Sequence, residues 1–452
     1  MKKKMKMKRY TAIALLIMSV LYLNGCTSKV SAQTLSGASS AASEELPEKN
    51  AVVNNGGTVV RYQGSDYCWR YSPDSFSRGG LFAQYSAEQN TRNQMVRIHP
   101  DGTEEVLFED RGNGAVYILG DRMYLNYGYN NLYSVMPDGS DRVEYGAFSV
   151  WSSDDRAGTL LGYNTELYEI QLIDRSGNLH FLMDGKDVCY AGTEGEYSYC
   201  SLVDKETKEL ILYQIKTDGT KDPAEIDRYK LPADYADYTS ALQVAELDGI
   251  LYYSYGFYAG TGGYFQMGGI NAVKLDGTDA YECVESGAIA GEEFQVENKN
   301  GAVRIYYVPA AGDVTGSCIG YWDDSAYGGC AVKNMASGAT EASDFPLSRR
   351  GSFVYLDGAV SRMKENEAAY EELIPESLAD SLGCNTISAA EDQEMMIIRN
   401  LEQLGKDIYF TVETGRREPS EDVGWRPFYV RESSSCYKMK SGEETAQMLY
   451  TY

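Results

Sequence analysis

One short phrase recurs along this sequence and limits what the chain can fold into. It is an apolar segment that runs into a glycine-containing turn and then into polar residues. Asp-Gly and Ser-Gly pairs tolerate the positive φ that tight hairpins need. Five copies share one register, and two later copies are shifted by one residue. The glycines of these copies are Gly102, Gly139, Gly177, Gly219 and Gly277, followed by the shifted Gly338 and Gly442.

A second phrase, a turn followed by an aromatic-rich strand, precedes the first in most copies, for example at 248–253 and 405–410. Together with flanking strands, each unit holds three or four strands. The glycine-to-glycine spacings are 37, 38, 42, 58, 61 and 104 residues. A four-stranded propeller blade takes roughly 40–50 residues, so the last spacing fits two blades, one of them degenerate near 351–358.

We therefore predict an all-β fold, a β-propeller of about seven four-stranded blades, with six or eight as alternatives. The segment 362–374 has a helical composition, and we expect one short inserted helix there. A β-sandwich is less favoured, because a period of about 40 residues with the same turn in each unit indicates radial repetition.

The tandem units resemble the DUF5050-type β-propeller domain of secreted Firmicutes lipoproteins and, more broadly, TolB-like propellers. The resemblance covers roughly residues 57–452, and the stretch 359–394 and the shifted copies depart from the pattern. It implies a propeller with no established catalytic residues, so none is carried over to this chain.

The N-terminus predicts export and lipid attachment. Six cations precede an apolar run at 12–21, which is the pattern of a secretory signal and is too short for an ordinary spanning helix. The run ends in Leu23-Asn24-Gly25-Cys26, which looks like the lipobox of bacterial lipoproteins. The resemblance implies cleavage after Gly25 and a lipid on Cys26. We thus expect a signal peptide at 1–25, a lipidated disordered tether at 26–56 and a propeller at 57–452.

The charge excludes one class of partner. The formal net charge is −25, and removal of residues 1–25 takes away six cations and no acid, leaving about −31. Such a chain is repelled by phosphate backbones, so we expect no nucleic-acid partner. The expected location is the extracellular face of the cell membrane, held there by the lipid anchor.

Eight cysteines remain beside Cys26, an even number that permits disulfides outside the cytoplasm. Cys189 with Cys200 and Cys318 with Cys330 are the pairs to test first, and free buried thiols are the equal alternative. No pair has CxxC spacing, which gives no support to a zinc site.

Catalytic signals are scarce. The two histidines, His99 and His180, lie beside repeat strands, where a surface role is favoured over a catalytic triad. The acid doublets are Asp154-Asp155, Glu292-Glu293 and Asp323-Asp324. Adjacent strand residues point to opposite faces, so none is a natural glycosidase pair. No EF-hand loop occurs; we expect no metal and no cofactor.

Aromatic side chains in two glycine-rich loops are the candidate binding residues. Tyrosine offers a large contact area at a small entropy cost, which suits the recognition of a glycan or protein surface. Packing between blades is the competing role for these rings. The candidates are Tyr255, Phe257, Tyr258, Tyr264 and Phe265 in the first loop and Tyr321, Trp322 and Tyr327 in the second.

The preferred hypothesis is a lipid-anchored, non-catalytic binding or scaffold module at the bacterial cell envelope. The first alternative is an extracellular glycan-acting enzyme, which would have a deep central pocket with two facing carboxylates, or a glycan-binding protein. The second is a TolB-like accessory of envelope assembly, whose partner would be a protein. The ligand is an envelope protein or glycan that the sequence does not specify.

Overall fold

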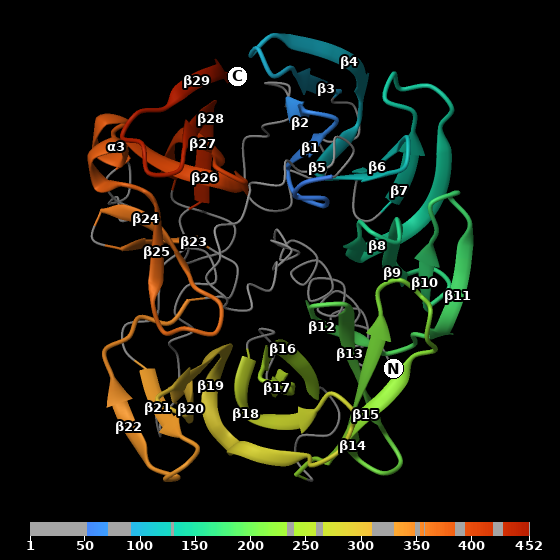
Figure 1. Cartoon of the computed structure of the whole chain (residues 1–452), viewed down its shortest axis with the longest axis vertical. Helices are drawn as coiled ribbons and strands as arrows, with labels where there is room; N and C mark the ends of the chain where they lie inside the picture. Colours follow the sequence, from blue (N-terminus) through green and yellow to red (C-terminus); the bar gives the residue numbers. More distant parts are fainter. Residues whose placement is uncertain are drawn as a thin grey trace, which may run out of the picture.

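The computed structural model of the chain describes residues 52–70, 92–127, 131–232, 239–258, 265–309, 330–348, 353–356, 358–384, 394–418 and 428–451. All strand pairings between named strands in this part are antiparallel and join strands that are neighbours in the chain. The sheets follow one another around a ring, from blue at the top through green and yellow to red (Figure 1). This is the predicted all-β propeller.

In the described residues the ring contains eight sheet units, which we number as blades in chain order. Blade 1 contains β1 (Val59–Tyr62), β2 (Ser65–Arg70), β3 (Asn93–Ile98) and β4 (Glu104–Asp110), and blade 2 contains β5 (Gly112–Leu119), β6 (Arg122–Tyr127), β7 (Asn131–Val135) and β8 (Val143–Asp154). Blade 3 contains β9 (Thr159–Asn164), β10 (Glu169–Ile173) and β11 (Leu179–Asp184). Blade 4 contains β12 (Cys189–Glu194), β13 (Tyr197–Asp204), β14 (Glu209–Lys216) and β15 (Ala224–Lys230).

Blade 5 contains β16 (Thr239–Leu247), β17 (Ile250–Tyr258), β18 (Phe265–Lys274) and β19 (Tyr281–Lys299), and blade 6 contains β20 (Ala302–Pro309), β21 (Cys330–Asn334) and β22 (Thr340–Ser343). Blade 7 contains β23 (Phe353–Leu356), β24 (Ala359–Met363) and β25 (Tyr370–Ile374). Blade 8 contains β26 (Glu394–Leu404), β27 (Asp407–Glu418), β28 (Phe428–Lys440) and β29 (Gln447–Thr451). Helix α3 (Glu376–Ser381) lies between β25 and β26 in the chain.

Two long strands each serve two blades. The first part of β8 pairs with β7 as the fourth strand of blade 2, and its second part, from Phe148, pairs with β9 as the first strand of blade 3. In the same way β19 pairs first with β18 and then, from Phe294, mainly with β20. The two seven-stranded sheets are therefore two blades each, and the eight blades fall within the predicted range.

First strands lie at the centre of the ring and fourth strands at its rim. The first strands contact one another from blade to blade, as β1 with β5 and β12 with β16. The fourth strands are largely exposed, with β4, β11 and β15 as examples. The apolar core consequently lies between blades, where the faces of adjacent sheets pack together.

The recurring glycines occupy the turn between the third and fourth strands, as the sequence predicts. Gly102, Gly139 and Gly177 have φ of 83°, 79° and 82°, and the later copies also have positive φ. In five of these turns an aspartate side chain accepts hydrogen bonds from residues after it; Asp101, for example, accepts from the backbone and hydroxyl of Thr103 at 2.9 and 2.7 Å. The side-chain hydrogen bonds of these five turns are therefore local to the recurring phrase.

The helix predicted at 362–374 is wrong in position. Residues 359–363 and 370–374 form β24 and β25, which pair from Met363–Tyr370 to Val360–Ile374, and the single helix of the described part follows at α3. Cross-strand pairing outweighs the helical composition of the segment. The turn between these strands has Asn366 at φ 54°.

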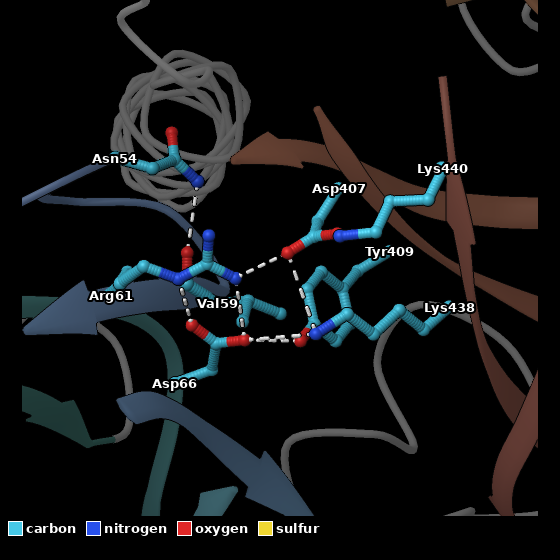
Figure 2. A network of polar contacts seen from close by, with 8 residues as sticks. All are labelled: Asn54, Val59, Arg61, Asp66, Asp407, Tyr409, Lys438 and Lys440. Atoms are coloured by element: carbon cyan, nitrogen blue, oxygen red, sulfur yellow. Dashed lines mark hydrogen bonds and ion pairs between the residues drawn. The ribbon is translucent and has the colours of Figure 1, made fainter. Parts of the chain in front are cut away.

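The ring closes without a shared strand, because the first and last sheets are each built from consecutive strands. We call the contact between blade 1 and blade 8 the seam. At its centre Arg61 of β1 donates to Asp66 of β2 at 2.6 and 2.9 Å and to Asp407 of β27 at 2.6 Å (Figure 2). The side chains of both aspartates are less than a tenth exposed.

Blade 8 supplies the remaining groups of this network. The hydroxyl of Tyr409 donates to Asp66, and the ammonium of Lys440 donates to Asp407. Lys438 lies between the two carboxylates, 3.4 Å from Asp66 and 3.5 Å from Asp407 (Figure 2). Burial alone would raise the pKa of Asp407, but the hydrogen bonds from Lys440 and Arg61 hold it below its ordinary value.

A second polar contact crosses the seam nearer the centre of the ring. The buried carboxylate of Glu402 accepts from the Asn54 amide at 2.9 Å and from the Thr58 backbone at 3.1 Å. Burial raises the pKa of Glu402. Val53 pairs with Arg61, so packing in the described chain extends at least four residues before the predicted boundary at 57.

The cysteines in the described part are thiols. Cys189 and Cys200 lie on the neighbouring strands β12 and β13 and are free, and Cys318 lies outside the described residues. Cys68 is buried at the seam, 3.8 Å from the hydroxyl of Tyr450. Burial raises the pKa of Cys68 to about 12, which makes it an unreactive packing group.

Candidate functional site

The strand order gives the ring two unlike faces. On one, which we call the turn face, the first strand of each blade connects to the second and the third to the fourth. On the other, the loop face, the second strand connects to the third and each blade connects to the next. The strand ends bordering 71–91, 259–264, 310–329 and 419–427 all lie on the loop face, because each segment joins a second strand to a third.

Both predicted aromatic loops are therefore bordered by strand ends on the loop face. The backbones of Phe257, Tyr258 and Phe265 end the β17–β18 hairpin, where Tyr258 pairs with Phe265. The side chains of these three residues, and all of Tyr264, Tyr321, Trp322 and Tyr327, lie outside the described residues, as does Cys26. Their binding role stays a prediction.

Tyr255 does not belong to an exposed loop. It lies inside β17 and is 2% exposed, and its hydroxyl donates to the hydroxyl of Tyr229 at 3.1 Å. Tyr229 in turn donates to Glu282 at 2.8 Å. The ring of Tyr255 packs between blades 4 and 5, because strand pairing continues past the point where the glycine-rich composition suggested a loop.

Two matched turns on the loop face differ sharply in chemistry. In blade 3, Asn164 accepts from the backbones of Glu166 and Leu167 at 3.1 and 2.9 Å, and the turn ends at Tyr168 with φ 57°. In blade 4, Asp204 accepts from the backbones of residues 206 and 207 at 2.8 and 3.1 Å, and the turn ends at Lys208 with φ 60°. The two turns have the same construction.

The blade 3 turn displays apolar side chains where its blade 4 counterpart displays polar ones. Leu167 is 59% exposed and Tyr168 is 55% exposed, whereas the equivalent positions in blade 4 hold Thr207 and Lys208. The turn geometry does not require apolar residues, since the polar copy forms the same hydrogen bonds. Exposed large apolar side chains grouped together indicate an interaction site.

An aromatic stack lies beneath this turn. Trp151 of β8 stacks on Tyr163 of β9 and on Tyr190 of β12, with ring centroids 5.9 and 5.1 Å apart. The strand register shifts at Trp151, a bulge that re-aims its side chain. Trp151 is buried, while Tyr163 and Tyr190 are partly exposed.

Hydroxyl groups continue the stack towards the core. Tyr190 contacts the hydroxyl of Thr193 at 2.7 Å, Thr193 contacts Ser198 at 2.7 Å, and Ser198 contacts Ser152 at 2.8 Å. Tyr190 also donates to the backbone carbonyl of Trp151 at 3.1 Å. This chain of hydroxyls fixes the orientation of the stacked rings and makes them a rigid platform.

Two aspartates lie close to the aromatic stack. Burial raises the pKa of Tyr163 to about 12, with further contributions from Tyr168, Asp187 and Asp184 close by. Asp187 is 58% exposed and pairs with Lys205 at 2.8 Å. We call the exposed turn 164–168 with the rings of Trp151, Tyr163 and Tyr190 the aromatic platform. Its chemistry suits contact with apolar or sugar surfaces.

Among the described residues, the histidines and acid doublets do not come together as a catalytic triad, a glycosidase pair or a metal site. His99 lies 3.4 Å from Glu105, and His180 lies 2.7 Å from Asp174, both on blade rims. Asp154 and Asp155 have structural partners: Asp154 accepts from two backbone N–H groups of its own turn, and Asp155 accepts from Asn55 at 2.8 Å. In the described part, three or more potential metal ligands do not cluster.

Asp323-Asp324 and the side chain of Glu292 lie outside the described residues, while Glu293 is buried at 5% exposure. Among the helices of the described part, the length and apolarity needed to cross a membrane are not reached.

No protein-family model and no curated protein matches the chain. Solved structures similar to it include the N-terminal domain of Nup159, at 13% identity and TM-score 0.32 over 73% of this chain and 92% of that one. Virginiamycin B lyase from Staphylococcus aureus has 11% identity and TM-score 0.32 over 65% and 89%. Puromycin hydrolase has 12% identity and TM-score 0.34 over 81% and 59%.

The sequence did not point to Leu167, Tyr168 or the Trp151 stack. A signal was nevertheless present: 164–168 and 204–208 occupy the same place in consecutive repeats, and one reads N-T-E-L-Y where the other reads D-K-E-T-K. Aligning the repeats on their second strands would have exposed this contrast.

Proposed function

We propose that this chain is a lipid-anchored, extracytoplasmic β-propeller that binds an envelope ligand on its loop face without catalysing a reaction. The observation that carries the proposal is the contrast between the two matched turns. Leu167 and Tyr168 are apolar and exposed in a turn that forms equally well with polar residues. The adjoining aromatic platform gives the ligand a rigid surface, which limits the entropy lost on binding.

A lipid anchor at the N-terminus would be compatible with a ligand site on the loop face. Val53 pairs with Arg61, two residues before the Gln63–Gly64 turn, so the described residues begin towards the turn face. A tether from Cys26 would join the ring on that side and leave the loop face open towards the ligand. If residues 27–51 form the tether expected from the sequence, this segment would span roughly 25–30 Å on average.

The ligand class is an envelope glycan or protein. Stacked tyrosine and tryptophan rings flanked by carboxylates and hydroxyls suit sugar rings, which offer apolar faces and hydroxyl groups. The resemblance of the repeats to DUF5050-type and TolB-like propellers supports an envelope role and leaves a protein partner as the second possibility.

The binding test compares variants of the two matched turns. The purified ring without its lipid is applied to isolated cell-wall sacculi and to a glycan array. We expect the Leu167→Ala/Tyr168→Ala variant to bind at least tenfold more weakly, while Thr207→Ala/Lys208→Ala in the matched turn binds like wild type. Equal losses in both variants, or none in either, would contradict the site. In-cell crosslinking from position 168 separates a protein partner from a glycan.

The anchor is tested separately. We expect a Cys26→Ser chain to be released into the medium and to incorporate no labelled lipid, while the ring itself folds unchanged. Retention of this variant in the membrane would argue against lipid attachment at this cysteine and would leave the loop-face proposal untouched.

A further inference from the structure

The rim strand of blade 3 has an unusual composition. β11 is the terminal strand of its sheet, so one row of its backbone N–H and C=O groups faces away from the sheet. Leu179 and Phe181 on this strand are 43% and 61% exposed. Together with Leu167 and Tyr168, they are four of the eight large apolar side chains in the described part that are exposed.

Two other rim strands carry the charges that normally protect an edge. β15 in the next blade contains Glu225, Asp227, Arg228 and Lys230 within seven residues, and β4 has acids at both ends. β11 reads L-H-F-L-M-D, with one carboxylate at its last position. An edge strand whose outward residues carry no charge is ready to pair with another strand.

Packing within the blade does not explain the outward side chains of β11. Leu182 and Met183 pack against the cluster around Trp151 and supply the inward contacts of the strand. Leu179 and Phe181 remain outside this cluster. The uncharged rim strand β29 differs in this respect, because its Leu449 packs into the seam and its Tyr450 contacts Cys68.

The charge around β11 indicates what kind of strand fits. The segment 164–187 contains five acids and two cations, a net charge of −3. A second copy of this chain brings a formal charge of −25 and is disfavoured by repulsion. An incoming strand with apolar residues at alternate positions and basic residues between or beside them complements both the edge and its surroundings.

We propose that β11 is a docking edge for an extended, basic and apolar segment of a partner protein, which adds to blade 3 as a fifth strand. Backbone hydrogen bonds to the open edge supply the affinity. The exposed side chains of Leu179 and Phe181 favour apolar residues at every second position of the partner strand. The surface is distinct from the aromatic platform on the loop face, so either one can fail without the other.

The test uses two synthetic probes and the mature ring carrying Cys26→Ser. One peptide alternates valine and lysine, and the other alternates valine and glutamate at the same length. We expect the lysine peptide to bind at least tenfold more tightly by fluorescence anisotropy. Amide hydrogen exchange should slow at 179–184 when it binds.

Two matched variants distinguish edge pairing from general attraction to an acidic protein. Phe181→Lys adds one positive charge at the edge and should weaken binding at least tenfold. Ala224→Lys adds the same charge at an exposed position on β15 and should change binding less than twofold. Both sites are exposed, so both variants should melt at the wild-type temperature. If Phe181→Lys alters folding, Leu179→Lys replaces it as the edge variant.

Three outcomes would overturn the proposal. The first is equal binding of the two peptides. The second is unchanged exchange at β11 in the complex. The third is a concentration-dependent dimer in sedimentation that Phe181→Lys abolishes, which would make a second copy of this chain the occupant.

Discussion

Two blade junctions of this ring are held together in opposite ways. Between blades 2 and 3 the backbone itself is continuous, because β8 is the last strand of one blade and the first strand of the next. The side chains at this junction form an apolar cluster that includes Tyr124, Leu132, Phe148 and Ile173. At the seam no strand is shared, and Arg61, Asp66 and Asp407 meet in a buried ionic network (Figure 2).

The difference shows where a repeat protein needs specificity. At β8 the covalent chain fixes the register of the two blades, so apolar packing is sufficient. At the seam, the partners are separated by 346 residues along the chain and only side chains can align them. Buried ion pairs add little net stability compared with apolar packing, but their loss is costly once one partner is removed. They make the correct closure distinguishable from a shifted one.

The largest expected effect follows from removing Asp66. Asp66→Ala leaves Arg61 and Tyr409 without their shared carboxylate in a buried setting, and we expect a loss of about 3–5 kcal/mol in the free energy of unfolding. Denaturant titration followed by circular dichroism measures it. Asp187→Ala breaks an ion pair whose side chains are 58% and 65% exposed and should cost less than about 1 kcal/mol.

If Asp66→Ala proved as mild as Asp187→Ala, the seam would not depend on its charges, and the comparison with the β8 junction would lose its basis.

An intermediate effect is expected from pH. The pKa of Asp407 is lowered in the folded chain, so its ionised form stabilises the fold at all pH values above its unfolded pKa. That contribution should disappear as pH falls below about 4 and through the lowered pKa. Wild type and Asp407→Asn should therefore differ at pH 7 and converge under acid conditions, as measured by unfolding midpoints between pH 2 and pH 7.

At the same seam, Glu402 is expected to change the stability of the fold with pH in the opposite direction to Asp407. Because burial raises its pKa, the folded state binds a proton more tightly than the unfolded one, and stability falls as pH rises from the ordinary glutamate pKa through the raised value. Glu402→Gln should remove this fall. An acid profile in which both variants shift the curve in the same direction would contradict the assignment of the two carboxylates.

The turns of this protein could be predicted from the sequence and the seam could not. An Asp-Gly-Thr turn is fixed by contacts within four residues, as between Asp101 and Thr103, so its signature survives in the local sequence. The pairing of Arg61 with Asp407 leaves no local trace. The exposed residues Leu167 and Tyr168 stand out only against Thr207 and Lys208 in the next repeat, because their own segment is neither glycine-rich nor rich in aromatic residues.

Blade 7 shows a failure of local inference as well. The segment 364–369 is rich in helix-forming residues, yet it is a hairpin turn because β24 and β25 pair on either side of it. The spacing of 104 residues between Gly338 and Gly442 spans the three-stranded sheet β23-β24-β25, whose turn at 364–369 contains no glycine. A search restricted to glycine therefore misses one repeat.

The smallest expected effect tests whether the two kinds of junction unfold together. Asn366 has φ 54°, and its side-chain oxygen is buried without a hydrogen-bond partner. Asn366→Gly relieves both costs, and we expect a gain of about 0.5–1 kcal/mol, whereas Asn366→Ala retains the strained backbone and gives no such gain. The flanking turn is held by blade 6, since Gln295 donates to the carbonyls of Lys364 and Glu367 at 2.8 and 3.1 Å.

This turn lies away from the seam, so the gain from Asn366→Gly should add to the loss from Asp66→Ala if the ring unfolds in one step. A single transition with additive midpoints indicates that the seam is as cooperative as the continuous junctions. If the seam opens first, the Asp66→Ala chain shows two transitions, and Asn366→Gly shifts only the later one. That result would show that ionic closure isolates the ends of the ring from the stability of the blades between them.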